Sequence, residues 1–459
     1  MNREVDRKTK IILYEKPIWK GLLYLSFPVF LVNILKTVHD VIDGIFLGQF
    51  PGDEIATSMQ SAVSLTWPIF FVFISFGMGL SIAGNALIGQ YVGKGDYELA
   101  KKYSNNTVFI ALVLGLLFTV LAYVFAPAIL TMMGAKGTDK DFAITYLRIR
   151  SFEMPILFLT FAFEAVRRST GDTITPVIIS AFGIIVNIIL TPILVLYLRL
   201  GITGAALSTL FAHLTILPPT IYYLMKSRNG INVKLNLNTL NKTVVKDIFK
   251  IGIPASAGQS IQAVGFVILN ALIYAYGTSV SAAFFIGNRI NSLVMFPVSA
   301  VASIVAIYIA QNIGAQNVAR AKESVKQGII LSVVMMIIGV SILLPFRYFI
   351  VQLFSNNEPT IAFAAEYTLY IGIGLPLMAL FQCFLSTYQG SGDTHFSFIL
   401  AVFRLWVLRL PLILLANRFT DLGPTGIWYA MLLSNLFAAV LGFYLYKKVK
   451  FTPKTRKVL

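Results

Sequence analysis

Carboxylates inside long apolar stretches are the residues of this chain best suited to carry chemistry. Asp40 and Asp43 lie three positions apart in the first apolar stretch, and Lys36 precedes Asp40 by four. On a helix, residues at this spacing share one face. Two carboxylates close together in a low dielectric oppose each other's ionisation, so one of them tends to hold a proton near neutral pH. The alternative is a structural ion pair between Lys36 and Asp40.

Acidic residues are unevenly divided between the apolar stretches of the two halves of the chain. A charged side chain at the centre of a membrane helix costs about 2.5 to 3.5 kcal/mol on insertion scales. The first half nevertheless carries Asp40, Asp43, Glu153 and Glu164, whereas the second half carries only Glu366. If one of these carboxylates binds a functional cation such as a proton or a metal ion, we therefore expect it in the N-terminal half.

Other polar residues in apolar stretches are candidates for a cavity or a gate. Glu153 precedes Pro155 near the end of its stretch, and Lys36 lies beside Asp40. Arg404 and Arg409 lie in the middle of FRLWVLRLPL, too deep for both to reach the membrane surface easily. At least one of them should face a cavity or a carbonyl partner.

Two polar residues have simpler interpretations. Glu164 lies four residues before Arg168, the spacing of an ion pair on a helix surface. His213 is expected to be an interior histidine with its hydrogen bonds satisfied.

An internal repeat organises the chain. The segment GQYVGKGDYELA at Gln90 corresponds to AQNIGAQNVARA at Gln311, 221 positions later. Gly171-Asp172-Thr173 and Gly392-Asp393-Thr394 have the same offset, as do Pro155 and Pro376, while segments 200–204 and 422–426 are displaced by 222. Duplicated halves around a central cavity are common in membrane transporters.

Composition predicts a membrane protein. The chain is 57% hydrophobic and 12% charged, with a mean hydropathy of +0.78. Its apolar runs are continuous and about 20 residues or longer, which favours helices over a barrel. We predict an all-α integral membrane protein with twelve transmembrane helices in two pseudo-symmetric six-helix bundles. The predicted spans are 19–48, 58–87, 105–131, 143–166, 173–198, 202–225, 248–276, 284–311, 328–354, 364–388, 396–416 and 424–446.

Charge predicts the orientation. Lys and Arg account for a net charge of +17 and gather in the N-terminal tail, the segment 226–247 and the C-terminal tail. The positive-inside rule places these segments in the cytoplasm, in a multi-pass protein of the cell membrane. We predict an N-terminal bundle at 1–225, a cytoplasmic linker at 226–247, and a C-terminal bundle with a basic tail at 248–459. The charge is interpreted as a topology signal and not as a nucleic-acid footprint.

The motifs together resemble the multidrug and toxic compound extrusion (MATE) family. HDVIDGIFLG is similar to its Asn-x-x-Asp-x-x-x-x-Gly segment, and GQYVGKGDYELA to its glycine-glutamine-glycine turn. RRSTGDTITP, NIILTPILVL and LGITGAALST resemble later motifs in the same order. The resemblance implies export of amphipathic, often cationic compounds, driven by inward flow of H⁺ or Na⁺ and without a cofactor.

The resemblance also implies a coupling site. Asp43 takes the position of the family's first-span aspartate, and Asp40 that of an asparagine. The surrounding polar positions are filled by Tyr146, Asn187, Thr191 and Thr209. Thr191 departs from an aspartate frequent in the proton-coupled branch; its hydroxyl could coordinate Na⁺ near Asp43 but cannot titrate. Gln262 stands where a sodium-linked branch has glutamate, which argues against a C-terminal sodium site.

Two other functions were weighed. A flippase for lipid-linked oligosaccharide or lipid would use cationic cavity residues, and Arg404, Arg409, Arg289 and Lys36 keep that alternative open. A membrane-embedded enzyme would need a catalytic cluster, and the sequence offers no such arrangement. As partners we expect small, cationic organic substrates and membrane lipids, no nucleic acid, and action as a monomer.

Overall fold

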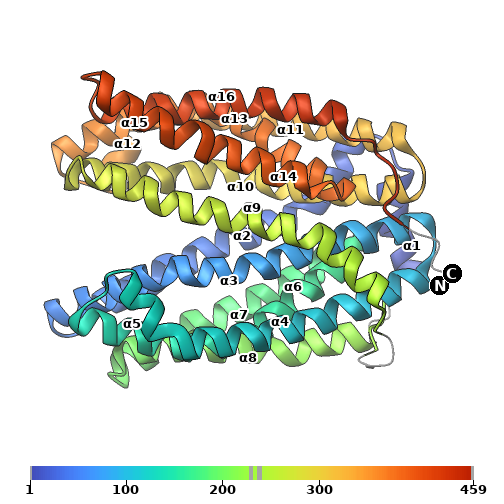
Figure 1. The fold of residues 1–459 in the computed structure, drawn as a ribbon, viewed down its shortest axis with the longest axis horizontal. Helices are drawn as coiled ribbons and strands as arrows, with labels where there is room; N and C mark the ends of the chain where they lie inside the picture. The colour runs from blue at the N-terminus through green and yellow to red at the C-terminus, as the bar shows by residue number, and fades with distance from the viewer. Residues whose placement is uncertain (1–2, 227–230, 235–239, 456–459) are drawn as a thin grey trace. The chain divides into compact units, whose positions relative to one another are not determined.

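The computed structural model describes residues 3–226, 231–234 and 240–455, except for the side chains of residues 3–7, 40, 41 and 43. Most of the described residues are helical. Figure 1 shows the helices in chain order. The longer helices are α2 (Ile18–Gly48), α3 (Asp53–Lys94), α4 (Tyr97–Met132), α8 (Gly201–Lys226), α9 (Lys242–Tyr274), α10 (Thr278–Gly314), α11 (Val318–Leu343), α13 (Glu358–Ser391) and α16 (Pro424–Lys448). The shorter ones are α1 (Arg3–Leu13), α5 (Gly137–Ser151), α6 (Met154–Ser169), α7 (Ile174–Pro192), α12 (Arg347–Gln352), α14 (Thr394–Val402) and α15 (Leu410–Phe419), with π-helical segments η1 (Ile193–Tyr197) and η3 (Phe403–Arg409).

The predicted all-α membrane fold is confirmed. Within the described ranges, eleven helices, counting α7 with η1 and α14 with η3 and α15, are long and apolar enough to cross a membrane. They match eleven of the twelve predicted spans. The expected span 143–166 differs, because it consists of two shorter helices, α5 and α6. Pro155 stands in the first turn of α6, where its missing N–H costs no hydrogen bond, so the chain ends one helix and begins another there.

The repeat found in the sequence recurs in the backbone. Asp96 caps α4 by accepting a hydrogen bond from the Leu99 amide, and Asn317, 221 positions later, caps α11 in the same way through Arg320. Gly171 and Gly392, which have the same offset, adopt φ of 81° and 79°. A glycine adopts this left-handed conformation without the steric cost of a Cβ, which accounts for the Gly-Asp-Thr turn in both halves.

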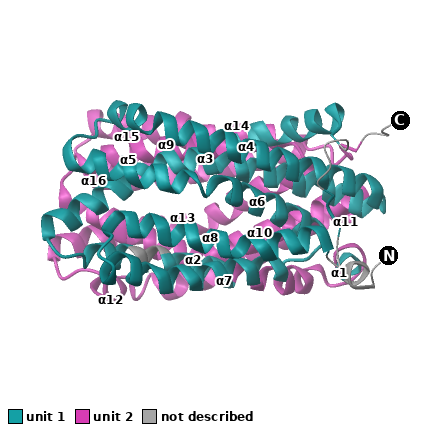
Figure 2. Ribbon diagram, turned by 90° about the horizontal axis from the view of Figure 1, so that it is seen from below, with its two compact units in different colours: residues 1–10, 31–256 teal, residues 11–30, 257–459 magenta. Residues whose placement is uncertain are grey.

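The helices form two compact units, which Figure 2 distinguishes by colour. Unit 1 contains residues 1–10 and 31–256, and unit 2 contains residues 11–30 and 257–459. In unit 1, α3 packs against α4, α5 and α6, and α7 packs against α8. In unit 2, α10 and α13 pack together and each contacts α11. These units are groups of packed residues, so the division of the chain at 1–225, 226–247 and 248–459 stays a prediction.

Apolar side chains occupy both the interior and the exterior of the units. Tyr91, Tyr103 and Phe158 are fully buried in unit 1, as Tyr308 and Trp428 are in unit 2. Many other large apolar residues of the long helices are exposed, including Leu116, Val120 and Val124 on one face of α4. An exterior of this kind suits contact with lipid.

Candidate functional site in unit 1

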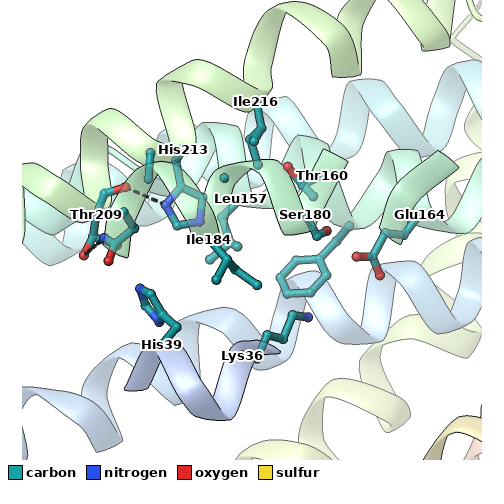
Figure 3. A pocket seen from close by; sticks show the side chains of 14 residues that line it. Lys36, His39, Leu157, Thr160, Glu164, Ser180, Ile184, Thr209, His213 and Ile216 are labelled. Atoms are coloured by element: carbon teal, nitrogen blue, oxygen red, sulfur yellow. Dashed lines mark hydrogen bonds between the residues drawn. The ribbon is translucent and has the colours of Figure 1, made fainter. Parts of the chain in front are cut away.

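A polar cavity of about 200 Å³ lies inside unit 1. Figure 3 shows Lys36 and His39 on α2 facing His213 and Thr209 on α8, with Thr160 and Glu164 on α6 and Ser180 on α7 nearby. Asn187 of α7 completes the polar lining, and Leu157, Ile184 and Ile216 supply apolar walls. Four helices thus bring polar side chains together at membrane depth, where such groups require a reason.

A chain of hydroxyl and amide groups lies beside this cavity. Asn187 donates from Nδ2 to Thr209 Oγ1 at 3.3 Å, and Thr191 donates to Asn187 Oδ1 at 3.1 Å. Thr191 Oγ1 also lies 3.1 Å from Ser208 Oγ. All four side chains are buried. The structure therefore brings Asn187, Thr191 and Thr209 together, as the sequence predicted.

A close contact between backbones allows this polar chain to form. A Cβ on Gly204 would lie 2.6 Å from the carbonyl oxygen of Leu194, so only glycine permits the start of α8 to pack so closely against η1. Ser208 and Thr209 follow one turn later on α8, and Thr191 comes just before η1. The glycine in LGITGAALST thus helps to set the separation at which the hydroxyls meet.

A buried carboxylate lies at the junction of α5 and α6. Glu153 has no exposed surface, and its Oε1 accepts a hydrogen bond from Arg150 Nη2 at 2.6 Å. Arg150 also donates to Tyr146 Oη at 3.2 Å and stacks over Phe70, with its guanidinium 4.3 Å from the ring centroid. Glu153 and Arg150 thus form an ion pair at this junction.

His213 connects this ion pair to the polar chain. Its Nδ1 lies 2.9 Å from the carbonyl oxygen of Thr209 and 3.5 Å from Glu153 Oε2. Because a carbonyl only accepts hydrogen bonds, Nδ1 carries a hydrogen. Glu153 Oε2 is itself buried without a hydrogen-bond partner. A shift of the His213 ring, or of a proton, toward this oxygen would give it a hydrogen bond. Tyr146 is therefore linked to Thr209 through three charged or titratable side chains.

The predicted site residues are unevenly described. Asp40 and Asp43 lie in α2, but their side chains are outside the described part of the chain. Lys36 lines the cavity from the same helix. Glu164 also lines the cavity and pairs with Arg168 at 3.1 Å, as its spacing predicted.

In unit 2, the two remaining candidates contact each other. Arg404 Nη2 donates to Gln262 Oε1 at 3.3 Å in a separate cavity. The roles of both residues, and that of Lys36, stay predictions.

Sequence reasoning missed Arg150 and Ser208. Arg150 lies inside the predicted span 143–166 without a predicted role, although its position three residues before Glu153 is the spacing of a helical ion pair. Ser208 precedes Thr209 and had no signal of its own, because its role depends on the contact between α8 and Thr191 across the bundle.

Metal ligands of the usual kinds do not cluster in the described residues, since no group of three His, Cys, Asp or Glu side chains is close enough to hold an ion. The oxygen atoms of Asn187, Thr191, Ser208 and Thr209 are hard donors that suit a proton relay or a sodium ion. The chemistry of this donor set therefore fits either of the two predicted coupling cations.

Two units of membrane-spanning helices with a polar interior define a helical membrane transporter. The MatE family model matches this chain twice, at residues 28–193 and 254–415, which together make up more than half of it. The chain belongs to the MATE family of multidrug efflux transporters, and the predicted resemblance is confirmed. Its members are transporters and not enzymes.

Relatives and solved structures agree with this assignment. The chain is 26% identical to a probable multidrug resistance protein, YoeA, of Bacillus subtilis, over 95% of this chain and 96% of that protein. It is 28% identical to the multidrug export protein MepA of Staphylococcus haemolyticus, over 94% of each. It also resembles a solved structure of a multidrug resistance MATE family transporter in an outward-facing conformation, with a TM-score of 0.89 and 23% identity over 97% of this chain and 98% of that one.

Proposed function

We propose that this transporter is an antiporter that exports amphipathic organic cations, driven by inward proton flow through the carboxylates of unit 1. The observation that carries the proposal is the polar cavity of unit 1. Lys36 and His39 line it from α2, and Asp43 follows His39 by four positions in that helix. Asn187 and Thr209 line the same cavity from α7 and α8.

The proposed coupling uses the charge of Asp43. An ionised Asp43 would attract the hydrogen-bond donors around the cavity, and a protonated one would lose this Coulomb attraction. A change of conformation requires such a difference in interaction free energy between two states. Protonation of Asp43, assisted by Asp40, is proposed to shift unit 1 between an inward- and an outward-facing shape and to release the exported compound outside.

Glu153 is proposed as a second participant. It is a buried carboxylate beside a histidine, and histidine titrates nearest to physiological pH. A proton that reaches His213 from the cavity would change the charge of the cluster formed by Arg150, Glu153 and His213. This change would favour a different packing of α5, α6 and α8.

The test is gradient-driven uptake of a cationic dye, ethidium, into proteoliposomes. With the lumen more acidic than the bath, protons leave as dye enters, and we expect rapid uptake by the wild-type protein. Asp43→Asn should reduce uptake to the rate of protein-free liposomes, whereas Asp421→Asn, an exposed loop residue, should leave it unchanged.

Each alternative has its own result in this assay. Uptake driven by an outward sodium gradient, and not by protons, would make Asp43 and its neighbours ligands of Na⁺. Normal proton-driven uptake by Asp43→Asn would contradict the role of this carboxylate. No uptake of dye under either gradient would contradict cation export and favour the flippase.

A further inference from the structure

A second polar cavity, of about 220 Å³, lies inside unit 2. The charged residues described in its lining are all basic, whereas the cavity of unit 1 is lined by both Lys36 and Glu164. Two arginines, Arg404 and Arg409, line it, and both are at least nine-tenths buried. Its other polar lining residues are neutral, and no Asp or Glu is among the described residues that line it. The coupling mechanism proposed for unit 1 gives this cavity no role.

Local helix geometry brings the two arginines into one cavity. Residues five positions apart on an α-helix lie about 140° apart around its axis. Phe403–Arg409 instead form the π-helical segment η3, in which hydrogen bonds run from i to i+5 and residues five apart lie nearly above each other. Short π-helical segments are frequent at functional sites. The widened turn therefore presents Arg404 and Arg409 to the same cavity.

Neutral groups hold both guanidinium groups. Arg404 contacts Gln262 Oε1 at 3.3 Å and Met378 Sδ at 2.9 Å, and it stacks over Phe381 with its guanidinium carbon 4.0 Å from the ring centroid. Arg409 donates from Nε to Ser434 Oγ at 3.0 Å and from Nη2 to Asn435 Oδ1 at 2.8 Å. These contacts orient the guanidinium groups but leave their positive charges without a counter-charge.

One donor in the cavity has no acceptor. Arg404 Nε is buried and has no hydrogen-bond partner. Within the described residues, neither Arg404 nor Arg409 takes part in an ion pair. Buried charges in proteins are ordinarily paired or neutralised, so two unpaired arginines in one cavity indicate a missing anion.

We propose that this cavity binds the anionic oxygen group, a carboxylate or a phosphate ester, of an amphipathic organic molecule. Guanidinium groups match both kinds of group by planar, charge-assisted hydrogen bonds. The cavity walls include Phe266, Met295, Leu375 and Met378, which suit an apolar body attached to the anion. The ligand is either a transported compound that bears an acid group or the headgroup of an anionic lipid.

Binding to the purified, full-length transporter in a neutral detergent tests the proposal. The first probe is 2-naphthoate, compared with its methyl ester, which has the same apolar body without the charge. The second is dihexanoyl phosphatidylglycerol, compared with dihexanoyl phosphatidylcholine. By isothermal titration calorimetry, we expect the wild-type protein to bind one or both anions at least about tenfold more tightly than the matched uncharged or zwitterionic compound, a difference of about 1.4 kcal/mol.

Five variants locate the site. Arg404→Gln and Arg409→Gln should each abolish this preference for the anion, whereas Arg418→Gln, an exposed arginine of the neighbouring α15, should retain it. Arg404→Lys and Arg409→Lys keep the charge without the planar fork, and they should bind with intermediate affinity while keeping the folded elution profile of the wild type.

The results separate the sources of the anion and the ways in which the proposal could be wrong. Preference for naphthoate alone indicates a transported acid, and preference for phosphatidylglycerol alone indicates a lipid headgroup. Equal affinity for the charged and uncharged partners in both pairs overturns the proposal, as does an equal loss of preference in Arg418→Gln. Because no gradient is applied, these results do not depend on the coupling mechanism proposed for unit 1.

Discussion

Glu153 is the buried acid whose surroundings are most fully described, and its energetics depend on Arg150. A buried ion pair gains Coulomb energy but loses the hydration of both charges, so its net contribution to folding is small. Removing one partner is different, because it leaves the other charge buried and uncompensated. Arg150 Nε is already buried without a hydrogen-bond partner, so loss of Glu153 would add to the unsatisfied donors of this side chain.

Glu153→Gln should therefore destabilise the protein more than its loss of a single hydrogen bond suggests. We expect a loss of about 3 to 5 kcal/mol in the free energy of unfolding, the range for a broken buried ion pair. Glu164→Gln is the matched control: Glu164 keeps 13% of its side-chain exposure whereas Glu153 has none, and a partly exposed pair contributes at most about 1 kcal/mol.

Denaturant unfolding in detergent measures both variants. A loss for Glu153→Gln no larger than for Glu164→Gln would show that the buried pair has no special energetic role. In the double variant Arg150→Met with Glu153→Gln, much of the stability should return, because no buried charge is then left unpaired.

At the scale of residues, the sequence predicted those parts of the site that depend on helical spacing and motif order. Asn187, Thr191 and Thr209 are close in space, as predicted. Ser208 was missed because its partner Thr191 lies on another helix, and Arg150 because its partner Glu153 lies across the break between α5 and α6. The sequence also could not predict that Arg404 and Arg409 line the same cavity, since α-helical spacing would have placed them on different faces of the helix.

At the scale of elements, the Gly-Asp-Thr turns of the two halves are each held by a lysine near one end of the chain. Lys8 Nζ lies 2.9 Å from Asp172 Oδ1 in unit 1, and Lys454 Nζ lies 2.7 Å from Asp393 Oδ1 in unit 2. The two lysines are not related by the repeat offset. Each Gly-Asp-Thr turn is thus held by an ion pair, to the N-terminal tail in unit 1 and to the C-terminal tail in unit 2.

The ion pair between Lys8 and Asp172 predicts that the stability of the fold depends on pH. Burial works to raise the pKa of Asp172, but the charge and hydrogen bond of Lys8, with the hydrogen bonds of Thr175, outweigh it and hold the pKa below the ordinary carboxyl value. A carboxyl group with a lowered folded-state pKa stabilises the fold above its unfolded pKa, about 3.9. This stabilisation is lost as the pH falls through the lower, folded value.

Thermal unfolding between about pH 3 and pH 7 should show this effect in Asp172→Asn. The variant should be less stable than the wild type at neutral pH, and the two should converge in acid. Asp421→Asn, in an exposed loop, should follow the wild type throughout. A constant difference between Asp172→Asn and the wild type at every pH would mean that the carboxylate charge does not provide the stabilisation.

The helices themselves were largely predictable, because lipid demands continuous apolar stretches of a known length. The exception, 143–166, shows where that argument stops. Glu153 and Pro155 interrupt the stretch, and Glu153 is accommodated by Arg150 and His213, which a hydropathy pattern does not register. The break between α5 and α6 is therefore a feature of the site as much as of the fold.

At the scale of the whole molecule, the cavities of the duplicated halves differ in their charged lining. Lys36 and Glu164 both line the cavity of unit 1, whereas the charged residues described in the lining of the unit 2 cavity are Arg404 and Arg409. Duplication supplied two similar helical bundles, and substitutions at a few interior positions gave them different chemistry.

The predicted membrane topology depends on how many times the helices cross the membrane. If α5 and α6 together cross the membrane once, the eleven longer helices and this pair make twelve crossings, and both ends of the chain lie on one side. From the basic tails and the positive-inside rule, we predict that this side is the cytoplasm. The loop before α16, which contains the exposed Asp421, then faces outward.

Single-cysteine labelling in intact cells tests this arrangement, because the native Cys383 is fully buried and should react little. A membrane-impermeant maleimide should label Asp421→Cys in intact cells, and Tyr14→Cys and Thr452→Cys only after permeabilisation; all three positions are exposed. The reverse pattern would place the termini outside. Labelling of only one of Tyr14→Cys and Thr452→Cys in intact cells would show that α5 and α6 do not complete a crossing. Arg150 and Glu153 would then belong to a re-entrant segment, while His213 stays on the membrane-spanning α8, and the proton path proposed for unit 1 would open to a different side of the membrane.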